Sequence, residues 1–101
     1  MKPIDRVIHE PARLRILMVL SGVHWADFAS LCRRLELTRG NLSAHTAQLE
    51  QSGYIRVSKS IVGKVPHTQY RLTPKGRQAL AEYWAALDEI RRLSNSEPED
   101  E

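Results

Sequence analysis

The sequence predicts a mainly α fold with a small β-hairpin, arranged as one α+β domain. Two observations in the middle of the chain lead to this prediction. Residues 28–51 hold two helical apolar patterns separated by a break at 36–38, which indicates two short helices joined by a turn. Residues 54–73 then mix β-branched and aromatic residues in partial alternation, as expected of two strands. A length of 101 residues suits one domain with a modest core.

Three helices are expected before the break. Apolar residues that share one edge predict a short helix near 4–9. Pro11 interrupts that pattern but fits the first turn of a new helix, which is expected over 11–21. The next helix is expected over about 25–35, although no good capping residue precedes it.

The helix after the break has two contrasting sides. Thr38 is a good N-terminal cap, because its hydroxyl can accept from an early backbone N–H, and the helix is expected to end near Gln51. Leu42 and Leu49 predict its buried side. The other side carries the polar residues Arg39, Asn41, Ser43, His45 and Gln48. A polar helix mounted on a small apolar helix is the layout of a helix-turn-helix, whose second helix enters the major groove of DNA.

A hairpin and a long helix complete the predicted fold. Strands are expected at 54–61 and 69–73, joined by a loop at 62–68 that contains Gly and Pro. The Thr-Pro pair at 73–74 predicts the start of a last helix that extends to about residue 93. The hairpin thus follows a run of helices, and the last three of these helices followed by a hairpin form the order of a winged helix-turn-helix.

The apolar stripe of the last helix is broad and includes the aromatic residues Tyr83 and Trp84. It provides more apolar surface than a core of this size needs, and such a surplus usually marks a protein interface. The alternative is that the helix folds back and buries the whole stripe within one chain.

Charge is distributed unevenly along the chain, whose net charge is +3. Residues 94–101 hold four acids and no base, and we expect them to form a disordered acidic tail after a domain of residues 1–93. Nine of the 15 bases but only two of the 12 acids lie between 31 and 77. That density suits a surface facing a polyanion, with a merely solvated basic face as the alternative. The tail could compete with DNA for this surface.

Four segments carry a resemblance to known proteins: 9–17 (HEPARLRIL), 37–45 (LTRGNLSAH), 49–55 (LEQSGYI) and 70–77 (YRLTPKGR). In this order they resemble bacterial and archaeal winged-helix transcriptional regulators of the ArsR/MarR kind. The resemblance covers about residues 4–93 and implies a homodimer held by the first and last helices. The interface residues expected on this basis are Ile4, Val7, Ile8, Tyr83, Trp84, Leu87 and Ile90.

These patterns predict a sequence-specific DNA-binding regulator, a homodimeric repressor of a near-palindromic operator. Expected contacts from the recognition helix are Thr38, Arg39, Asn41, Ser43, His45 and Gln48, since Arg can read guanine and Asn or Gln can read adenine. Expected contacts from the wing are Lys59, Lys64, His67 and Arg71. The resemblance also implies a basic residue, in many relatives, where this chain has Ala44 and often where it has Ala47, so we expect the wing and the flanking arginines to supply much of the affinity. The open alternative is a winged-helix module that docks an acidic protein partner.

Other classes of function find little support in the sequence. No HExxH, phosphate-loop, nucleophile-elbow or paired-carboxylate pattern occurs, so neither an enzymatic activity nor a cofactor is expected. The single Cys32 and four scattered histidines do not predict a metal site, and we interpret Cys32 as a core thiol rather than a redox sensor. The absence of a long apolar run or a secretory signal predicts a cytoplasmic protein. No pattern identifies a small-molecule effector.

Overall fold

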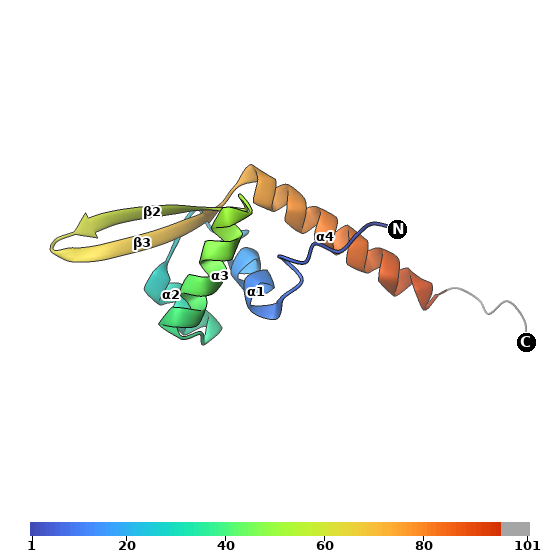
Figure 1. Cartoon of the computed structure of the whole chain (residues 1–101), viewed down its shortest axis with the longest axis horizontal. Helices are drawn as coiled ribbons and strands as arrows, with labels where there is room; N and C mark the ends of the chain where they lie inside the picture. Colours follow the sequence, from blue (N-terminus) through green and yellow to red (C-terminus); the bar gives the residue numbers. More distant parts are fainter. Residues whose placement is uncertain (96–101) are drawn as a thin grey trace, which may run out of the picture.

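The computed structural model describes residues 1–95 and has the predicted winged helix-turn-helix fold. In chain order the elements are α1 (Pro11–Leu20), β1 (Ala26–Asp27), α2 (Phe28–Leu35), α3 (Arg39–Gln51), β2 (Ile55–Val62), β3 (Val65–Leu72) and α4 (Pro74–Leu93). The three short helices form the body, the β2–β3 wing extends from one side, and α4 runs away from the other (Figure 1). Within this described part, no helix is long and apolar enough to span a bilayer.

The core lies where the three short helices meet the root of the wing. Its buried residues come from the arm before α1 and from α1, α2, α3, β2, β3 and α4: Ile8, Ile16, Leu17, Leu20, Leu31, Leu42, Leu49, Ile55, Tyr70, Leu72, Leu80 and Tyr83. Leu42 and Leu49 have no exposed surface, which confirms the predicted buried side of α3. Their burial turns the opposite, polar side of α3 to solvent.

The segment before α1 is a turn, so the prediction of a helix near 4–9 is wrong. Asp5 organises this turn, because its carboxylate accepts the amides of Val7 at 2.9 Å and Ile8 at 3.3 Å. Tyr54, at the root of the wing, donates its hydroxyl to the same carboxylate at 2.5 Å. Burial and this hydrogen bond raise the pKa of Tyr54 to about 12. Hydrogen bonds from nearby backbone amides to the Asp5 carboxylate stabilise a turn, and a helix as short as 4–9 nucleates too poorly to compete with that turn.

The sheet has a third strand that the sequence does not predict. Strand β1 pairs with β3, so the strand order is β1-β3-β2. Helix α2 therefore begins at Phe28 instead of near residue 25, and Asp27 caps it by accepting the Ser30 amide at 2.7 Å. A strand of two residues is too short to leave an alternating pattern in the sequence.

The wing has longer strands and a shorter loop than predicted. Strands β2 and β3 pair along their whole length, so the loop expected at 62–68 is only a two-residue turn at 63–64. Gly63 has a φ of 66°, a left-handed conformation that suits glycine in a tight hairpin. Pro66 is compatible with β3 because β1 pairs only with the other end of that strand.

Helix α4 begins and ends where predicted. The Thr73 hydroxyl accepts the Gly76 amide at 2.9 Å and donates to the Gly53 carbonyl at 2.6 Å, which ties the start of α4 to the end of α3. Farther along, α4 continues past the body beside the N-terminal arm (Figure 1), and the Lys2 amide donates to Glu89 at 2.8 Å. Residues 96–101 of the predicted acidic tail lie outside the described residues.

Candidate nucleic-acid interface

Helix α3 turns its predicted polar side outward. The Thr38 hydroxyl caps the first turn by accepting the Asn41 amide at 3.1 Å. The exposed predicted contacts on this segment are Thr38, Arg39, Asn41, Ser43 and Gln48, whereas His45 is half-buried. Ala44 and Ala47 are exposed between them. The outer surface of α3 is therefore polar but only weakly basic.

A groove of about 610 Å³ lies between α3 and the wing. It brings together four predicted contacts from the two elements, namely Arg39, Ser43, Lys59 and His67. The other predicted contacts do not line it: Thr38, Asn41, His45, Gln48, Lys64 and Arg71. A ligand seated along the groove would contact the helix and the wing at once.

Phe28 orients Arg39, a role that the sequence alone does not reveal. The Arg39 guanidinium carbon lies 4.8 Å from the centre of the Phe28 ring, where a cation–π contact is favourable. Phe28 is the first residue of α2 and Arg39 the first of α3, so the stacking joins the two helices of the motif. An arginine held in this way loses less side-chain entropy on binding. An aromatic residue at the start of the first helix of a helix-turn-helix is the signal that could have suggested it.

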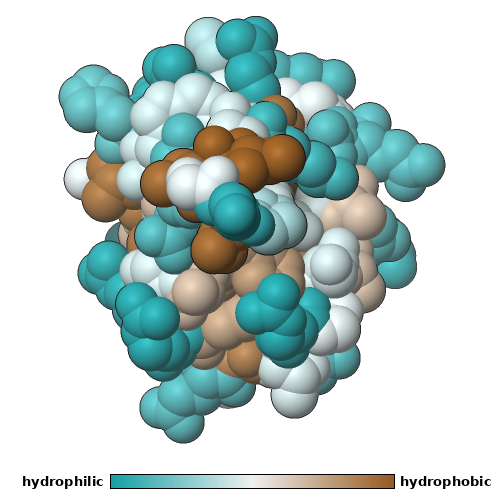
Figure 2. All heavy atoms as spheres, turned by 90° about the vertical axis from the view of Figure 1, so that its left-hand side faces the viewer, coloured by the Kyte–Doolittle hydropathy of each residue, from teal (hydrophilic) through white to brown (hydrophobic). Residues whose placement is uncertain are grey.

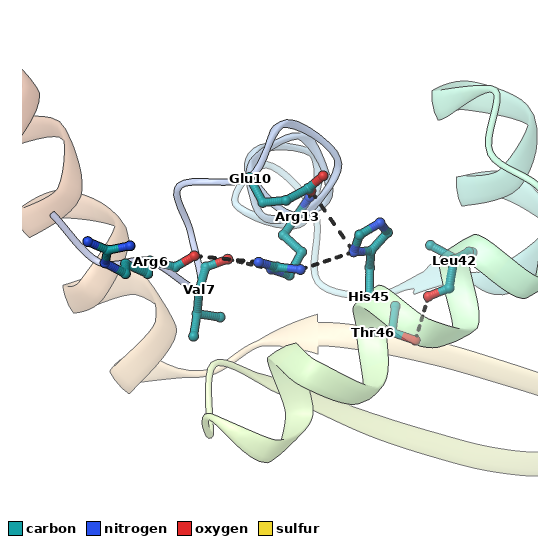
Figure 3. Close-up of polar contacts among 7 residues, drawn as sticks. All are labelled: Arg6, Val7, Glu10, Arg13, Leu42, His45 and Thr46. Carbon is teal, nitrogen blue, oxygen red and sulfur yellow. Dashed lines mark hydrogen bonds and ion pairs between the residues drawn. The ribbon is translucent and has the colours of Figure 1, made fainter.

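His45 points toward the start of α1 rather than along the outer surface of α3 (Figure 3). Its Nδ1 lies 3.3 Å from the Arg13 guanidinium and 4.0 Å from the Glu10 carboxylate. Arg13 is itself held by donating to the Val7 carbonyl at 2.5 Å. Burial acts to raise the pKa of Glu10, but the Arg13 amide and the neighbouring charge of His45 lower it overall. His45 is thus part of a contact between α1 and α3.

The groove itself is lined by two bases, Arg39 and Lys59, and two acids, Asp27 and Glu50, and further positive charge lies along the wing and at the start of α4. Residues 51–81 include no acid but six bases: Arg56, Lys59, Lys64, Arg71, Lys75 and Arg77. Lys59 and Lys64 are exposed along the wing, and the Arg71 guanidinium carbon lies 5.4 Å from the centre of a Trp25 ring at its root. Exposed bases at this density suit contact with phosphates.

The residues predicted for a dimer interface divide into three groups by their burial. Ile8 and Tyr83 are buried within one chain, and the Tyr83 hydroxyl lies 2.9 Å from Nδ1 of His9. Trp84 and Ile90 are each 43% exposed. Ile4, Val7 and Leu87 are partly buried against the core. The surplus apolar surface on α4 therefore lies on the part that extends past the body.

Cys32 is partly buried and packs against the core, as expected of a structural thiol. In the described range, 1–95, no group of three or more His, Cys, Asp or Glu side chains lies close enough together to hold a metal ion.

A polar helix beside a basic wing, both carried by a helix-turn-helix body, defines a winged-helix DNA-binding protein. The chain belongs to the family described as "Winged helix DNA-binding domain", whose profile matches residues 12–91. An uncharacterized protein of Methanocaldococcus jannaschii is 33% identical over 91 residues, which are 90% of this chain and 96% of that protein.

Solved structures with the same fold include transcriptional regulators. A transcriptional regulator homologue from Pyrococcus horikoshii OT3 superposes with a TM-score of 0.72 at 29% identity, over 85% of this chain and 89% of that one. A putative transcriptional regulator from Salmonella typhimurium has a TM-score of 0.71 at 26% identity, over 89% of this chain and 80% of that one. An ArsR family transcriptional regulator, at 24% identity, shares the fold. The predicted resemblance to winged-helix transcriptional regulators is thus confirmed.

Gly40, in the first turn of α3, has no packing reason to be glycine. A Cβ built there meets no neighbouring atom within 4 Å. Gly40→Ala is expected to raise the free energy of unfolding by about 0.5–1 kcal/mol, because alanine restricts the unfolded chain and favours a helix. Urea unfolding followed by circular dichroism measures the change. A loss of stability would contradict the open surroundings of this position.

Proposed function

We propose that the protein is a homodimeric repressor of transcription that occupies a near-palindromic operator. One observation supports DNA binding most strongly: the groove that joins the exposed arginine and serine of α3 to the lysine and histidine of the wing. The protein acts in the cytoplasm by occupying DNA, with no catalytic step. Arg39, Asn41 and Gln48 contact base edges, while Thr38, at the N-terminus of α3, and Lys59 contact phosphates.

The far half of α4 supports the dimer. Ala86 and Tyr83 bury the stripe of α4 against the body, and Ile90 continues this stripe four residues after Ala86. Ile90 and Leu93 are 43% and 59% exposed in a single chain. A second copy that covers them would place two α3 helices about a twofold axis. Each would enter one half-site, with the half-sites about 34–36 Å apart along the duplex.

Binding to duplex DNA selected from a random pool tests the proposal. Fluorescence anisotropy with the selected duplex should give an affinity that falls steeply with salt, with a log–log slope near −5 to −9 for about 6–10 phosphate contacts. The selected sequence should have twofold symmetry. If no salt-dependent binding occurs at low ionic strength, the proposal fails. If a pull-down with the protein recovers an acidic protein but no DNA, the docking-module alternative is favoured.

Ile90→Glu tests the dimer separately. A carboxylate in the covered stripe would be desolvated in each copy, so the dimer should dissociate and operator affinity should fall by at least about tenfold. Ala85→Glu is the matched control, because Ala85 is exposed and lies well away from Ile90 around the helix. Sedimentation velocity measures the mass of each variant. A dimer that survives Ile90→Glu unchanged would place the interface elsewhere.

A further inference from the structure

The tip of the wing is apolar, although it is the part of the wing farthest from the body (Figure 1). Ile61, Val62 and Val65 are 72%, 62% and 66% exposed. Viewed end-on, a hydrophobic cluster lies near the centre of this face, and most of the hydrophilic side chains lie toward its rim (Figure 2). More than half of each of these side chains is exposed, and an exposed apolar cluster of this kind usually marks an interaction site.

The tip is apolar on both faces. Val62 pairs with Val65, and Ile61 pairs with Pro66. Since successive side chains of a strand point to opposite faces, the two pairs lie on opposite sides of the ribbon. One apolar pair would suffice to stabilise the hairpin, at roughly 0.2–1 kcal/mol. A ribbon that is apolar on both sides fits a slot with two walls better than a flat surface, which would cover only one pair.

Charge restricts the nature of that slot. Lys64 lies in the turn itself and Lys59 two residues before Ile61, and no acid occurs from residue 51 to residue 81. Docking of one wing tip against the wing of a second copy would bring like charges together. The minor groove of DNA is a slot of negative potential with two sugar-lined walls, so it satisfies both the shape and the charge.

We propose that the wing tip is an apolar wedge that enters the minor groove beside the half-site contacted by α3 and bends the duplex there. The inference rests on the proposed DNA-binding function and adds the manner in which the wing engages DNA. Two paired strands about 4.8 Å apart, with side chains on both faces, exceed the ~6 Å width of an undistorted minor groove. Entry must therefore widen the groove and unstack a base step, which kinks DNA by roughly 20–90° toward the major groove.

Insertion of the wing tip also predicts a preference for particular base pairs that does not depend on hydrogen bonds between the protein and the bases. Aliphatic side chains cannot satisfy the amino group that guanine presents in the minor groove, so A·T pairs are favoured at the tip. Pyrimidine–purine steps unstack most easily, so a TA step is favoured most. This preference should appear in the selected duplex outside the bases that α3 reads.

The test measures binding and bending on the same duplex with the full chain. A selected duplex labelled at both ends reports bending by energy transfer, and 2-aminopurine at the flanking TA step reports unstacking. Anisotropy of the same complex reports affinity. Wild-type protein should raise energy transfer and increase 2-aminopurine fluorescence at saturation. Saturable binding without either change would overturn the wedge but leave the proposed function intact, whereas no binding would remove both.

Variants assign the bend to the tip. The double variant Ile61→Thr/Val62→Thr keeps β-branched residues in the strand, so the hairpin should persist while one member of each apolar pair becomes polar. It should bind about tenfold more weakly and leave energy transfer at the level of free DNA. Val23→Thr, at a 40% exposed position outside the wing, is the control and should bend DNA as wild type does. Lys64→Gln should lower the salt slope but keep the bend. The proposal would be overturned if the double variant still bent the duplex. It would also be overturned if the substitutions changed the oligomeric state of the protein instead of the bending of DNA.

Discussion

Arg39→Ala is expected to lower affinity for the selected operator by about 10- to 100-fold, since a bidentate contact to guanine contributes roughly 1–3 kcal/mol of discrimination. Affinity for unrelated duplex DNA should fall much less. Arg39 is exposed at the first position of α3, lines the groove and is stacked over Phe28 at 4.8 Å. The side chain is therefore both accessible and oriented before DNA arrives.

Competition anisotropy with operator and unrelated duplex at one salt concentration measures this difference. Arg15→Ala removes an exposed arginine from α1 and serves as the control for the loss of one positive charge. Phe28→Leu leaves Arg39 in place but removes the ring beneath it, so it should reproduce part of the loss. Equal weakening on both duplexes by Arg39→Ala would mean that this residue contacts only phosphate.

Gly76→Ala is expected to lower the free energy of unfolding by about 2–3 kcal/mol, the cost of forcing an extra methyl into a packed site. A Cβ at this position would lie 2.1 Å from the Tyr54 carbonyl oxygen and 2.8 Å from Cδ1 of Leu72. The carbonyl oxygen also accepts the Thr73 amide at 3.0 Å, so it cannot move aside without losing that bond. Helix α4 or the root of the wing must shift.

Urea unfolding followed by circular dichroism measures this loss, and a fall in Tm of about 8–24 °C should accompany it. Gly40→Ala is the paired control, because the same chemical change in open surroundings should increase stability. A loss below about 0.5 kcal/mol for Gly76→Ala would show that the start of α4 relaxes freely. Because stability here is expected to total only about 5–15 kcal/mol, the predicted loss is a large fraction of it.

The helix-turn-helix itself could be predicted because its signals are local. Thr38 and Thr73 cap α3 and α4 as predicted, since a hydroxyl reaches backbone amides only three residues away. The spacing of Leu42 and Leu49 placed one side of α3 in the core. Each of these features depends on neighbouring residues along the chain, so the sequence contains the information.

Features that depend on partners distant in the sequence could not be predicted. Strand β1 exists because β3 offers it an edge. The polar pattern of α3 predicts His45 as an outward contact, whereas its side chain reaches Arg13, 32 residues earlier. Strand β3 was predicted too short because Pro66 suggests a loop, while pairing with β2 holds it in a strand.

The sequence by itself determined the starts of α1, α3 and α4, the hairpin between α3 and α4, and the polar side of α3, because helix periodicity and capping act over a few residues. The tertiary structure decided which polar side chains share one surface. It joined Arg39 and Ser43 to Lys59 and His67 in a groove and set Phe28 beneath Arg39. It also placed Ile61 and Val62 at an exposed tip. These outcomes follow from packing the wing root and α3 onto one core, and that geometry is absent from any local pattern.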